Sequence, residues 1–165
     1  MAEIRKAKHE DSKAILAVMK DAEQSGYMLV NPGERNVAPE QFGGFIETIN
    51  QKEKSGLFVA CENDRILGYL MVQNEELQRV AHRAYLVIGV HSESRGKGIG
   101  RALFTYVLHW AKNKGLHRLD LTVIAYNHDA VELYKKMGFE VEGVKRDSLL
   151  VDGRYVDELY MSKLL

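Results

Sequence analysis

Val90-His91-Ser92-Glu93-Ser94-Arg95-Gly96-Lys97-Gly98-Ile99-Gly100-Arg101 is the stretch that most constrains the fold of this chain. The apolar run 85–90 that leads into it predicts a buried strand. Apolar residues after it recur at the spacing of one helix face: Ile99, Ala102, Leu103, Tyr106, Val107 and Trp110. A glycine-rich turn between a strand and a helix leaves backbone N–H groups unpaired at the positive end of the helix dipole. We therefore predict an anion site here, with the character of a pyrophosphate cradle.

Two common nucleotide-binding loops do not fit this turn. The nucleoside-triphosphate loop needs Ser or Thr after its Gly-Lys pair, and Gly98 follows Lys97 here. The dinucleotide fingerprint needs a third glycine where Arg101 stands. A glycine-rich connection with incidental charge is the remaining alternative. The preceding strand, the long helix and the cations Arg95, Lys97 and Arg101 together favour the anion site.

Arg95-x-x-Gly98-x-Gly100 resembles the coenzyme A signature of the GNAT superfamily of N-acetyltransferases. Downstream, Asn127-x-x-Ala130-x-x-Leu133-Tyr134-x-x-x-Gly138-Phe139 is similar to the second cofactor-facing segment of that family. One predicted helix and one predicted strand separate the two segments, as in the family. The resemblance is specific over residues 85–139 and rests on pattern alone elsewhere.

The resemblance implies acetyl-CoA as cosubstrate and no metal. Backbone N–H groups of residues 95–100 would hold the pyrophosphate, and pantetheine would pair with the strand edge near residues 88–90. The cofactor-binding residues implied in this way are Ile88, Gly89, Val90, Arg95, Gly96, Lys97, Gly98, Ile99, Gly100, Arg101, Asn127 and Tyr134. Gly89 fits either a close backbone approach or tight packing. The family often has proline where Ser92 stands, and the serine is expected to loosen the turn slightly.

Acetyl transfer from a thioester to an amine needs a neutral amine, a stabilised carbonyl oxygen and a proton for the leaving thiolate. In the family pattern a tyrosine supplies that proton, and Tyr134 stands at the matching position. A phenol with a pKa of about 10 suits a thiolate of comparable basicity. The alternative is a core aromatic, because Val131 and Met137 share its helical spacing. Asn127 is expected to cap the same helix.

The general base is not fixed by any motif. Four residues are candidates for deprotonating or attracting the acceptor, although the pattern favours a solvated surface residue over a catalyst at each: Glu47, His91, Asp157 and Glu158. The resemblance also allows an ordered water in this role.

Length and composition bound the remaining possibilities. A chain of 165 residues fits a single domain over residues 1–165 with a proper core. Its formal net charge of zero disfavours nucleic acid and anionic membranes as partners. Cys61 has no disulfide partner and is expected to be a buried, small apolar residue. The chain shows neither an apolar signal core nor a membrane-length run, so we expect a cytoplasmic protein.

The order of predicted elements indicates an α/β fold, a mixed, mostly antiparallel sheet with helices on both faces. Expected strands cover 4–7, 57–61, 66–73, 85–90, 118–124, 139–150 and 155–164. Expected helices run from a cap at Asp11 to Gly26, from Pro39, from Ile99 to Lys114-Gly115, and over 127–137. Hairpin turns are expected at 63–65 and at Asp152-Gly153. The resemblance adds that strands 85–90 and 118–124 splay apart to admit pantetheine.

The resemblance thus implies an N-acetyltransferase that transfers acetyl from acetyl-CoA to a primary amine. The acceptor would be a small molecule or a protein N-terminus, whose amine attacks the thioester directly in a ternary complex. A non-catalytic acyl-CoA-sensing module is the alternative. Family members commonly pair through sheet edges or helices, so the resemblance leaves a homodimer open.

Overall fold

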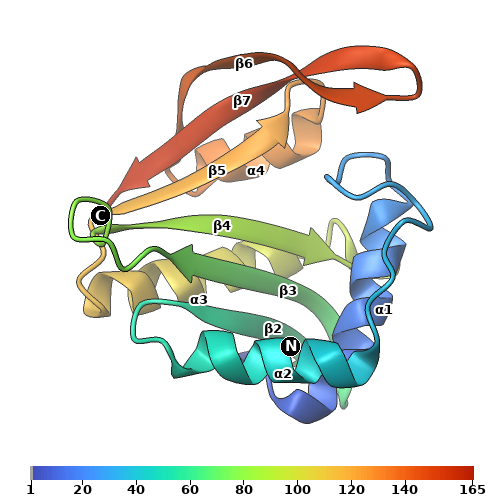
Figure 1. The fold of residues 1–165 in the computed structure, drawn as a ribbon, viewed down its shortest axis with the longest axis vertical. Coiled ribbons are helices and arrows are strands. Elements are labelled where there is room, and N and C mark those ends of the chain that lie inside the picture. Colours follow the sequence, from blue (N-terminus) through green and yellow to red (C-terminus); the bar gives the residue numbers. More distant parts are fainter. Residues whose placement is uncertain (1) are drawn as a thin grey trace.

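The apolar runs form one seven-stranded sheet in the computed structural model, which describes residues 2–165 (Figure 1). The strands are β1 (Glu3–Lys6), β2 (Gly56–Glu62), β3 (Arg65–Asn74), β4 (Arg83–Val90), β5 (Arg118–Ile124), β6 (Glu140–Val151) and β7 (Arg154–Leu164). Their order across the sheet is β1-β2-β3-β4-β5-β7-β6. Only the β4–β5 pair among these is parallel. The expected mixed, mostly antiparallel sheet is confirmed.

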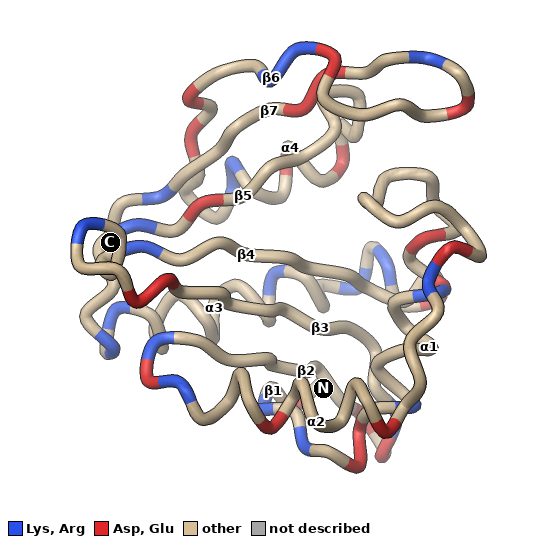
Figure 2. Tube along the Cα trace, in the orientation of Figure 1, with Lys and Arg blue, Asp and Glu red and all other residues tan. Residues whose placement is uncertain are grey.

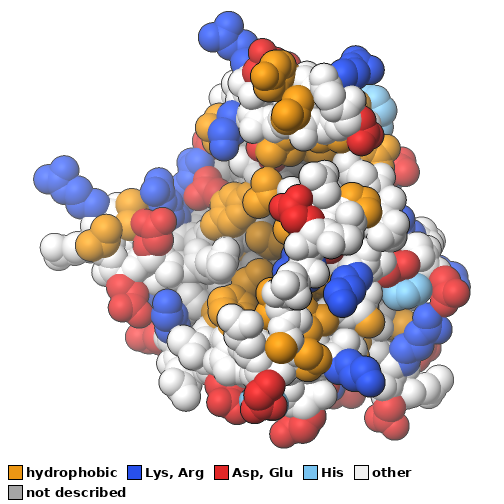
Figure 3. Space-filling view, turned by 45° about the vertical axis from the view of Figure 1, so that its right-hand side comes forward, with side chains coloured by type: hydrophobic (Ala, Val, Ile, Leu, Met, Phe, Trp, Pro, Cys, Tyr) orange, Lys and Arg blue, Asp and Glu red, His pale blue; other side chains and the backbone are white. Residues whose placement is uncertain are grey.

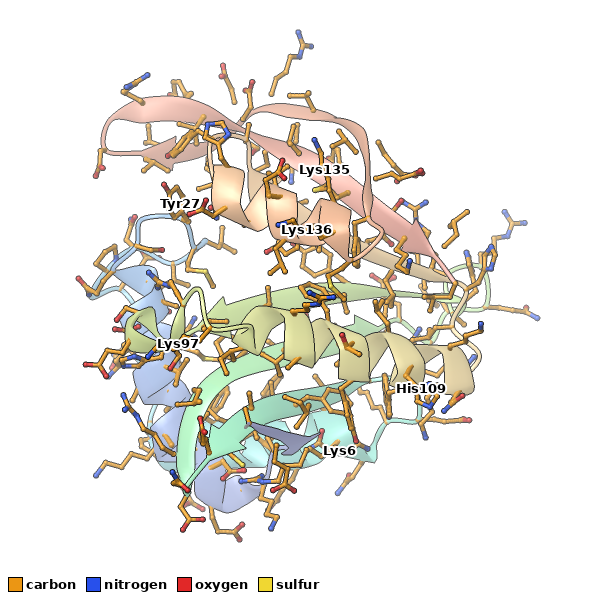
Figure 4. All side chains as sticks on the ribbon, turned by 180° about the vertical axis from the view of Figure 1, so that it is seen from behind. Lys6, Tyr27, Lys97, His109, Lys135 and Lys136 are labelled. Carbon is orange, nitrogen blue, oxygen red and sulfur yellow. The ribbon has the colours of Figure 1, made fainter. Side chains whose placement is uncertain are left out.

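Four α-helices within residues 2–165 cover the sheet on both faces, as expected. They are α1 (Ser12–Glu23), α2 (Pro39–Gln51), α3 (Ile99–Asn113) and α4 (His128–Lys136). Figure 1 shows α1 and α2 in front of the sheet, and Figure 4, the view from the back, shows α3 and α4 covering the opposite face. Each layer has its own core. Leu103 and Phe104 of α3 pack with Tyr134 on one face, and Ile15 and Ile46 pack with Leu57 on the other.

Turn chemistry places the hairpins where the sequence predicts them. Asn63 and Asp64 have φ of 51° and 62° between β2 and β3, and Asp152 and Gly153 have φ of 49° and 75° between β6 and β7. Both central residues of a type I′ turn need positive φ, which Asn, Asp and Gly tolerate best. The two hairpin predictions are therefore confirmed.

Asp11 is the N-cap residue of α1, as predicted, but the expected side-chain hydrogen bond is absent. Asp11 is also the last residue of a 3-10 turn, η1 (His9–Asp11), and its side chain makes no cap hydrogen bond to α1. Its carboxylate instead accepts hydrogen bonds from the backbone N–H of Lys8 at 2.8 Å and from Arg5 Nη1 at 2.7 Å. A guanidinium is a stronger, charge-assisted partner than a helix N–H. The helix also ends at Glu23, before the expected stop at Gly26.

Cys61 also departs from expectation. The sequence predicts a buried thiol, but Cys61 lies near the end of β2 and is only partly buried. Within residues 2–165, none of the helices is long and apolar enough to cross a membrane.

The β4–β5 pair opens along its length. Only Arg83, Ala84 and Tyr85 of β4 have register partners in β5. The two strands then diverge, and residues 86–90 of β4 run on without β5 beside them (Figure 1). The expected splay between these strands is confirmed, and it leaves an open strand edge that leads to the glycine-rich turn.

Candidate active site

The turn after β4 has the backbone conformation that its glycines allow. Gly96 and Gly98 have φ of 73° and 81°, and a Cβ at either would meet nothing within 4 Å. The need for glycine there is thus conformational rather than steric. Gly98 is the N-cap of α3, and no side chain within residues 2–165 caps that helix. The N–H groups of the first turn of α3 are therefore available to an anion.

Two other glycines of the predicted cofactor set allow close packing. A Cβ on Gly100 would lie 2.9 Å from Leu133 Cδ2, so this glycine lets α3 approach α4. A Cβ on Gly89 would lie 2.5 Å from Cε1 of Tyr69. Gly89 belongs to the half of β4 that β5 leaves unpaired, and the ring of Tyr69, its register partner in β3, covers it. Of the two alternatives for Gly89, the structure thus shows tight packing by a neighbouring side chain.

The turn carries the basic residues Arg95, Lys97 and Arg101, and Figure 2 marks the positions of Lys and Arg along the chain. Lys97 lies at the N-terminal end of α3, and Lys135 and Lys136 lie on α4 across the gap from it (Figure 4). The motif over residues 127–139 points to Asn127 and Tyr134 and does not predict these two lysines. Arg95 Nε donates to the carbonyl oxygen of Val90 at 3.3 Å. Its side chain therefore folds back over the end of β4.

Ser92, the residue that departs from the family pattern, is anchored. Its backbone N–H and its hydroxyl donate to the Asp21 carboxylate at 2.6 and 2.8 Å. Partial burial acts to raise the pKa of Asp21, but the hydrogen bonds from Ser92 outweigh it and hold that pKa below its ordinary value. The expectation of a looser turn is therefore wrong, because α1 supplies a fixed acceptor for the serine.

Tyr134 projects from α4 into the core beside the opening. It is 8% exposed, and its ring packs edge-to-face on Phe104 with centroids 5.6 Å apart. Its hydroxyl makes no hydrogen bond within residues 2–165. Burial, followed by the influence of Tyr85 and Tyr69, raises the pKa of this phenol well above its ordinary value. The proton therefore stays on Tyr134 at neutral pH, as a proton donor requires.

Asn127 ends the β5–α4 turn. Its Oδ1 accepts a hydrogen bond from the backbone N–H of Ala130 at 3.4 Å, so the predicted helix cap is confirmed. Next to it, the ring of Tyr126 lies 5.9 Å from that of Tyr27. This contact brings the segment between α1 and α2 to the open end of the β4–β5 gap (Figure 1).

The four candidate bases are not brought together. Glu47 Oε1 lies 2.9 Å from Nδ1 of His9, on η1. Glu158 accepts a hydrogen bond from the Ser148 hydroxyl at 2.9 Å. Asp157 accepts one from the backbone N–H of Asp147 at 2.8 Å.

His91 also has partners of its own. Its Nδ1 accepts from the Glu93 N–H, and its Nε2 lies 3.7 Å from Asp21. The structure thus supplies a local partner for each of the four candidates and gathers none of them beside Tyr134.

A pocket of about 490 Å³ lies at the closed end of the β4–β5 gap. Tyr85 Oη and Thr122 Oγ1, 2.7 Å apart, join the two strands there. Arg118 forms another part of the wall, donating from Nε to Asp120 at 2.7 Å and from Nη1 to Glu142 at 3.1 Å. Figure 3 shows a hollow with hydrophobic side chains between the β5–β7 part of the surface and the rest.

Comparison with known sequences points to one family. The family model "Acetyltransferase (GNAT) family" matches residues 18–139. L-amino acid N-acetyltransferase AaaT of Escherichia coli (strain K12) is 34% identical over 107 residues, which cover 64% of this chain and 66% of that protein. The [ribosomal protein uS5]-alanine N-acetyltransferase of the same organism is 29% identical over 105 residues, 63% of this chain and 53% of that protein. The chain thus spans less than two thirds of the length of these relatives.

Solved structures share the whole fold. The ribosomal-protein-alanine N-acetyltransferase from Brucella melitensis has a TM-score of 0.87 and 29% identity, with 99% of both chains covered. A GNAT-family acetyltransferase from Streptococcus pneumoniae has a TM-score of 0.94, 24% identity and 100% and 99% coverage. A putative acetyltransferase from Salmonella typhimurium, solved with acetyl-CoA, has a TM-score of 0.89, 23% identity and 99% and 94% coverage. The last two show the fold alone.

Proposed function

Because this chain belongs to the GNAT acetyltransferase family, we propose that it transfers an acetyl group from acetyl-CoA to a primary amine. The acceptor is a small molecule or a protein N-terminus, and its amine attacks directly within a ternary complex. In this proposal residues 1–165 act as a single domain. Three groups support it: the N–H cradle, the open edge of β4 and the buried Tyr134 phenol.

The cofactor side fits acetyl-CoA. The backbone N–H groups of residues 96–100, with Lys97 beside them, would hold the pyrophosphate. The backbone of residues 86–90, which β5 leaves unpaired, would hydrogen-bond the pantetheine arm. When bound, acetyl-CoA supplies an activated acetyl thioester.

The single observation that carries the catalytic proposal is the state of Tyr134. Its ring is buried, and its hydroxyl keeps its proton at neutral pH and makes no hydrogen bond within residues 2–165. Burial, followed by the influence of Tyr85 on β4 and Tyr69 on β3, raises the pKa of this hydroxyl. Tyr134 would thus give its proton to the departing thiolate.

The test is release of free thiol from acetyl-CoA in the presence of a panel of primary amines, with the acetylated product identified by mass. Amine-dependent release by the wild-type protein, and its loss in a Gly98→Glu variant, are the expected results. Tight acetyl-CoA binding without release toward any amine would contradict the proposal. That outcome would favour a non-catalytic acyl-CoA-binding module instead.

A further inference from the structure

The last residue of α1, Glu23, has a carboxylate oxygen that the protein leaves unsatisfied. Glu23 is 1% exposed, and its Oε2 accepts a hydrogen bond from Arg35 Nε at 2.6 Å. Its Oε1 is the one buried side-chain polar atom within residues 2–165 that has no hydrogen-bond partner. A buried, unsatisfied acceptor is costly, most of all on a charged group, and native proteins rarely keep one without a reason.

Glu23 lies on the side of the sheet from which an acceptor would enter. α1 packs against β3 and β4 on the face opposite α3 (Figure 1). Asp21, two residues before Glu23, accepts hydrogen bonds from Ser92 in the segment that leads into the cofactor turn. Tyr27, four residues after Glu23, contacts Tyr126 at the open end of the gap. Glu23 therefore lies on a stretch of chain that runs from the cofactor turn to the open end of the gap.

We propose that Glu23 Oε1 recognises a protonated amino group of the acceptor. An alkylammonium carries only donors and a positive charge, which match a carboxylate oxygen that lacks both a donor and a second counter-ion. Arg35 holds the other oxygen and so fixes the direction of Oε1. This inference rests on the proposed function and narrows its acceptor to the alkylammonium class.

Access to Glu23 depends on the chain that covers it. Arg35 belongs to the segment between α1 and α2, which contains no helix or strand over residues 24–38. Tyr27 of this segment contacts Tyr126 at the open end of the gap. Loops of this kind open more readily than the sheet they cover. Entry of the acceptor therefore requires this segment to move away from the end of α1.

The recognised ammonium is either the reacting amine or a second amino group on the same molecule. Three acceptors separate these sources: the best monoamine of the panel, 1,4-diaminobutane, and hydroxylamine, which is a nucleophile without charge at neutral pH. A Glu23→Gln variant keeps the shape of the side chain and removes its charge. We expect it to lower kcat/KM about ten- to a hundredfold for charged acceptors, mainly through KM. For hydroxylamine, kcat/KM should change by less than about twofold.

A loss for both the monoamine and the diamine would assign Oε1 to the reacting amine. A loss for the diamine alone would assign it to the second amino group. Either result supports recognition of an ammonium.

Two variants and one binding measurement serve as controls. Glu34→Gln changes an exposed carboxylate of the same segment, which accepts a hydrogen bond from Asn31 Nδ2 at 3.1 Å. This variant should leave kcat/KM unchanged for all three acceptors. Arg35→Gln removes the covering cation but keeps the carboxylate, so the preference for charged over uncharged acceptors should persist. Acetyl-CoA affinity and the melting temperature show whether each variant is folded.

An equal loss for charged and uncharged acceptors in Glu23→Gln, or no loss at all, would overturn the inference and leave Glu23 a structural residue. Loss of the charge preference in Arg35→Gln would also overturn it. Inactivity of the wild-type protein toward every acceptor is a different result, because it contradicts the proposed function itself and the inference with it.

Discussion

Asp21 on α1 accepts both hydrogen bonds that Ser92 can donate, from its backbone N–H and from its hydroxyl. The two residues are 71 positions apart in the chain. Ser92 opens the segment that leads into the N–H cradle, and α1 ends two residues after Asp21 at Glu23. The C-terminal end of α1 thus supports the cofactor turn through Asp21 and carries the proposed acceptor contact through Glu23.

Asp21→Asn should loosen the cofactor turn. An amide can accept only through Oδ1, and its Nδ2 would face a donor. We expect the melting temperature to fall by about 2–4 °C, the change that about 1 kcal/mol produces in a chain of this size. Acetyl-CoA binding should weaken by several-fold, whereas a Glu93→Gln change on the neighbouring exposed carboxylate should not affect it. Unchanged stability and affinity in Asp21→Asn would contradict this role.

The Asp21–Ser92 contact should also depend on pH. The pKa of Asp21 in the folded protein lies below its ordinary value, so the unfolded chain takes up the proton first as the pH falls. The stabilisation is present above the ordinary carboxyl range, at about pH 4, and is lost as the pH falls through the lowered pKa. Melting temperatures of the wild type and Asp21→Asn should therefore differ at neutral pH and converge in acid. A melting-temperature difference that stays constant down to about pH 2 would show that the contact does not depend on the charge of Asp21.

Gly98→Ala should weaken acetyl-CoA binding without a steric clash. A Cβ there meets nothing within 4 Å, but φ of 81° disfavours any other residue by about 1–2 kcal/mol. If the turn changes conformation to avoid this cost, its backbone N–H groups no longer point to one anion site. The dissociation constant for acetyl-CoA should then rise about five- to thirtyfold. Gly98→Glu should bind more weakly still, because its carboxylate repels the pyrophosphate.

Gly44→Ala on α2 is the matched control for Gly98. A Cβ there also meets nothing within 4 Å, and its φ is not positive. Alanine should stabilise this helix by up to about 1 kcal/mol without changing acetyl-CoA affinity. Equal affinity of the Gly98→Ala and Gly44→Ala variants, measured by calorimetry, would remove the basis for the cradle.

Tyr134→Phe should lower kcat about a hundredfold or more, because general acid catalysis contributes at least that much to such reactions. The ring remains packed on Phe104, so acetyl-CoA affinity and stability should stay close to those of the wild type. Tyr106→Phe, at a partly exposed tyrosine of α3, is the control and should keep full activity. A Tyr134→Phe variant with unchanged kcat would leave Tyr134 a core aromatic.

Gly89→Ala should destabilise the fold by about 1–3 kcal/mol, since the new methyl overlaps the Tyr69 ring. Adding Tyr69→Ala removes the ring, and the two changes together should destabilise less than the sum of their separate effects. Thermal unfolding of the two single variants and the double variant measures this coupling. If the two destabilisations are strictly additive, contact with the Tyr69 ring is not the reason for glycine at position 89.

The sequence predicts the elements best where local chemistry decides them. β5 is found at its predicted bounds, and both hairpins follow from their turn residues. The Asp11 side chain does not cap α1 because Arg5 and the backbone N–H of Lys8 take its carboxylate. Gly100 resembles part of an anion loop, but it also allows α3 to approach Leu133. Such contacts depend on how elements pack, which a local pattern does not contain.

The candidate site also contains some residues that a local motif predicts and others that only packing brings together. Its cofactor turn and Tyr134 lie within contiguous motifs and are visible in the sequence. The Glu23–Arg35 and Asp21–Ser92 pairs join segments that no motif connects. A glutamate at the end of an amphipathic helix reads as solvated, and only the packing of the following segment buries it. No signal in a single sequence distinguishes this glutamate from its exposed neighbours.

The open edge of β4 also has a consequence for the lifetime of the protein. Unpaired strand edges are where chains associate wrongly, and a ligand that binds along this edge would complete the sheet as an added strand does. Folding stability then depends on ligand concentration, rising by about 2.7 kcal/mol at a hundredfold excess over the dissociation constant. Resistance to proteolysis and aggregation would therefore follow the supply of acetyl-CoA, and starvation for it would shorten the life of the protein.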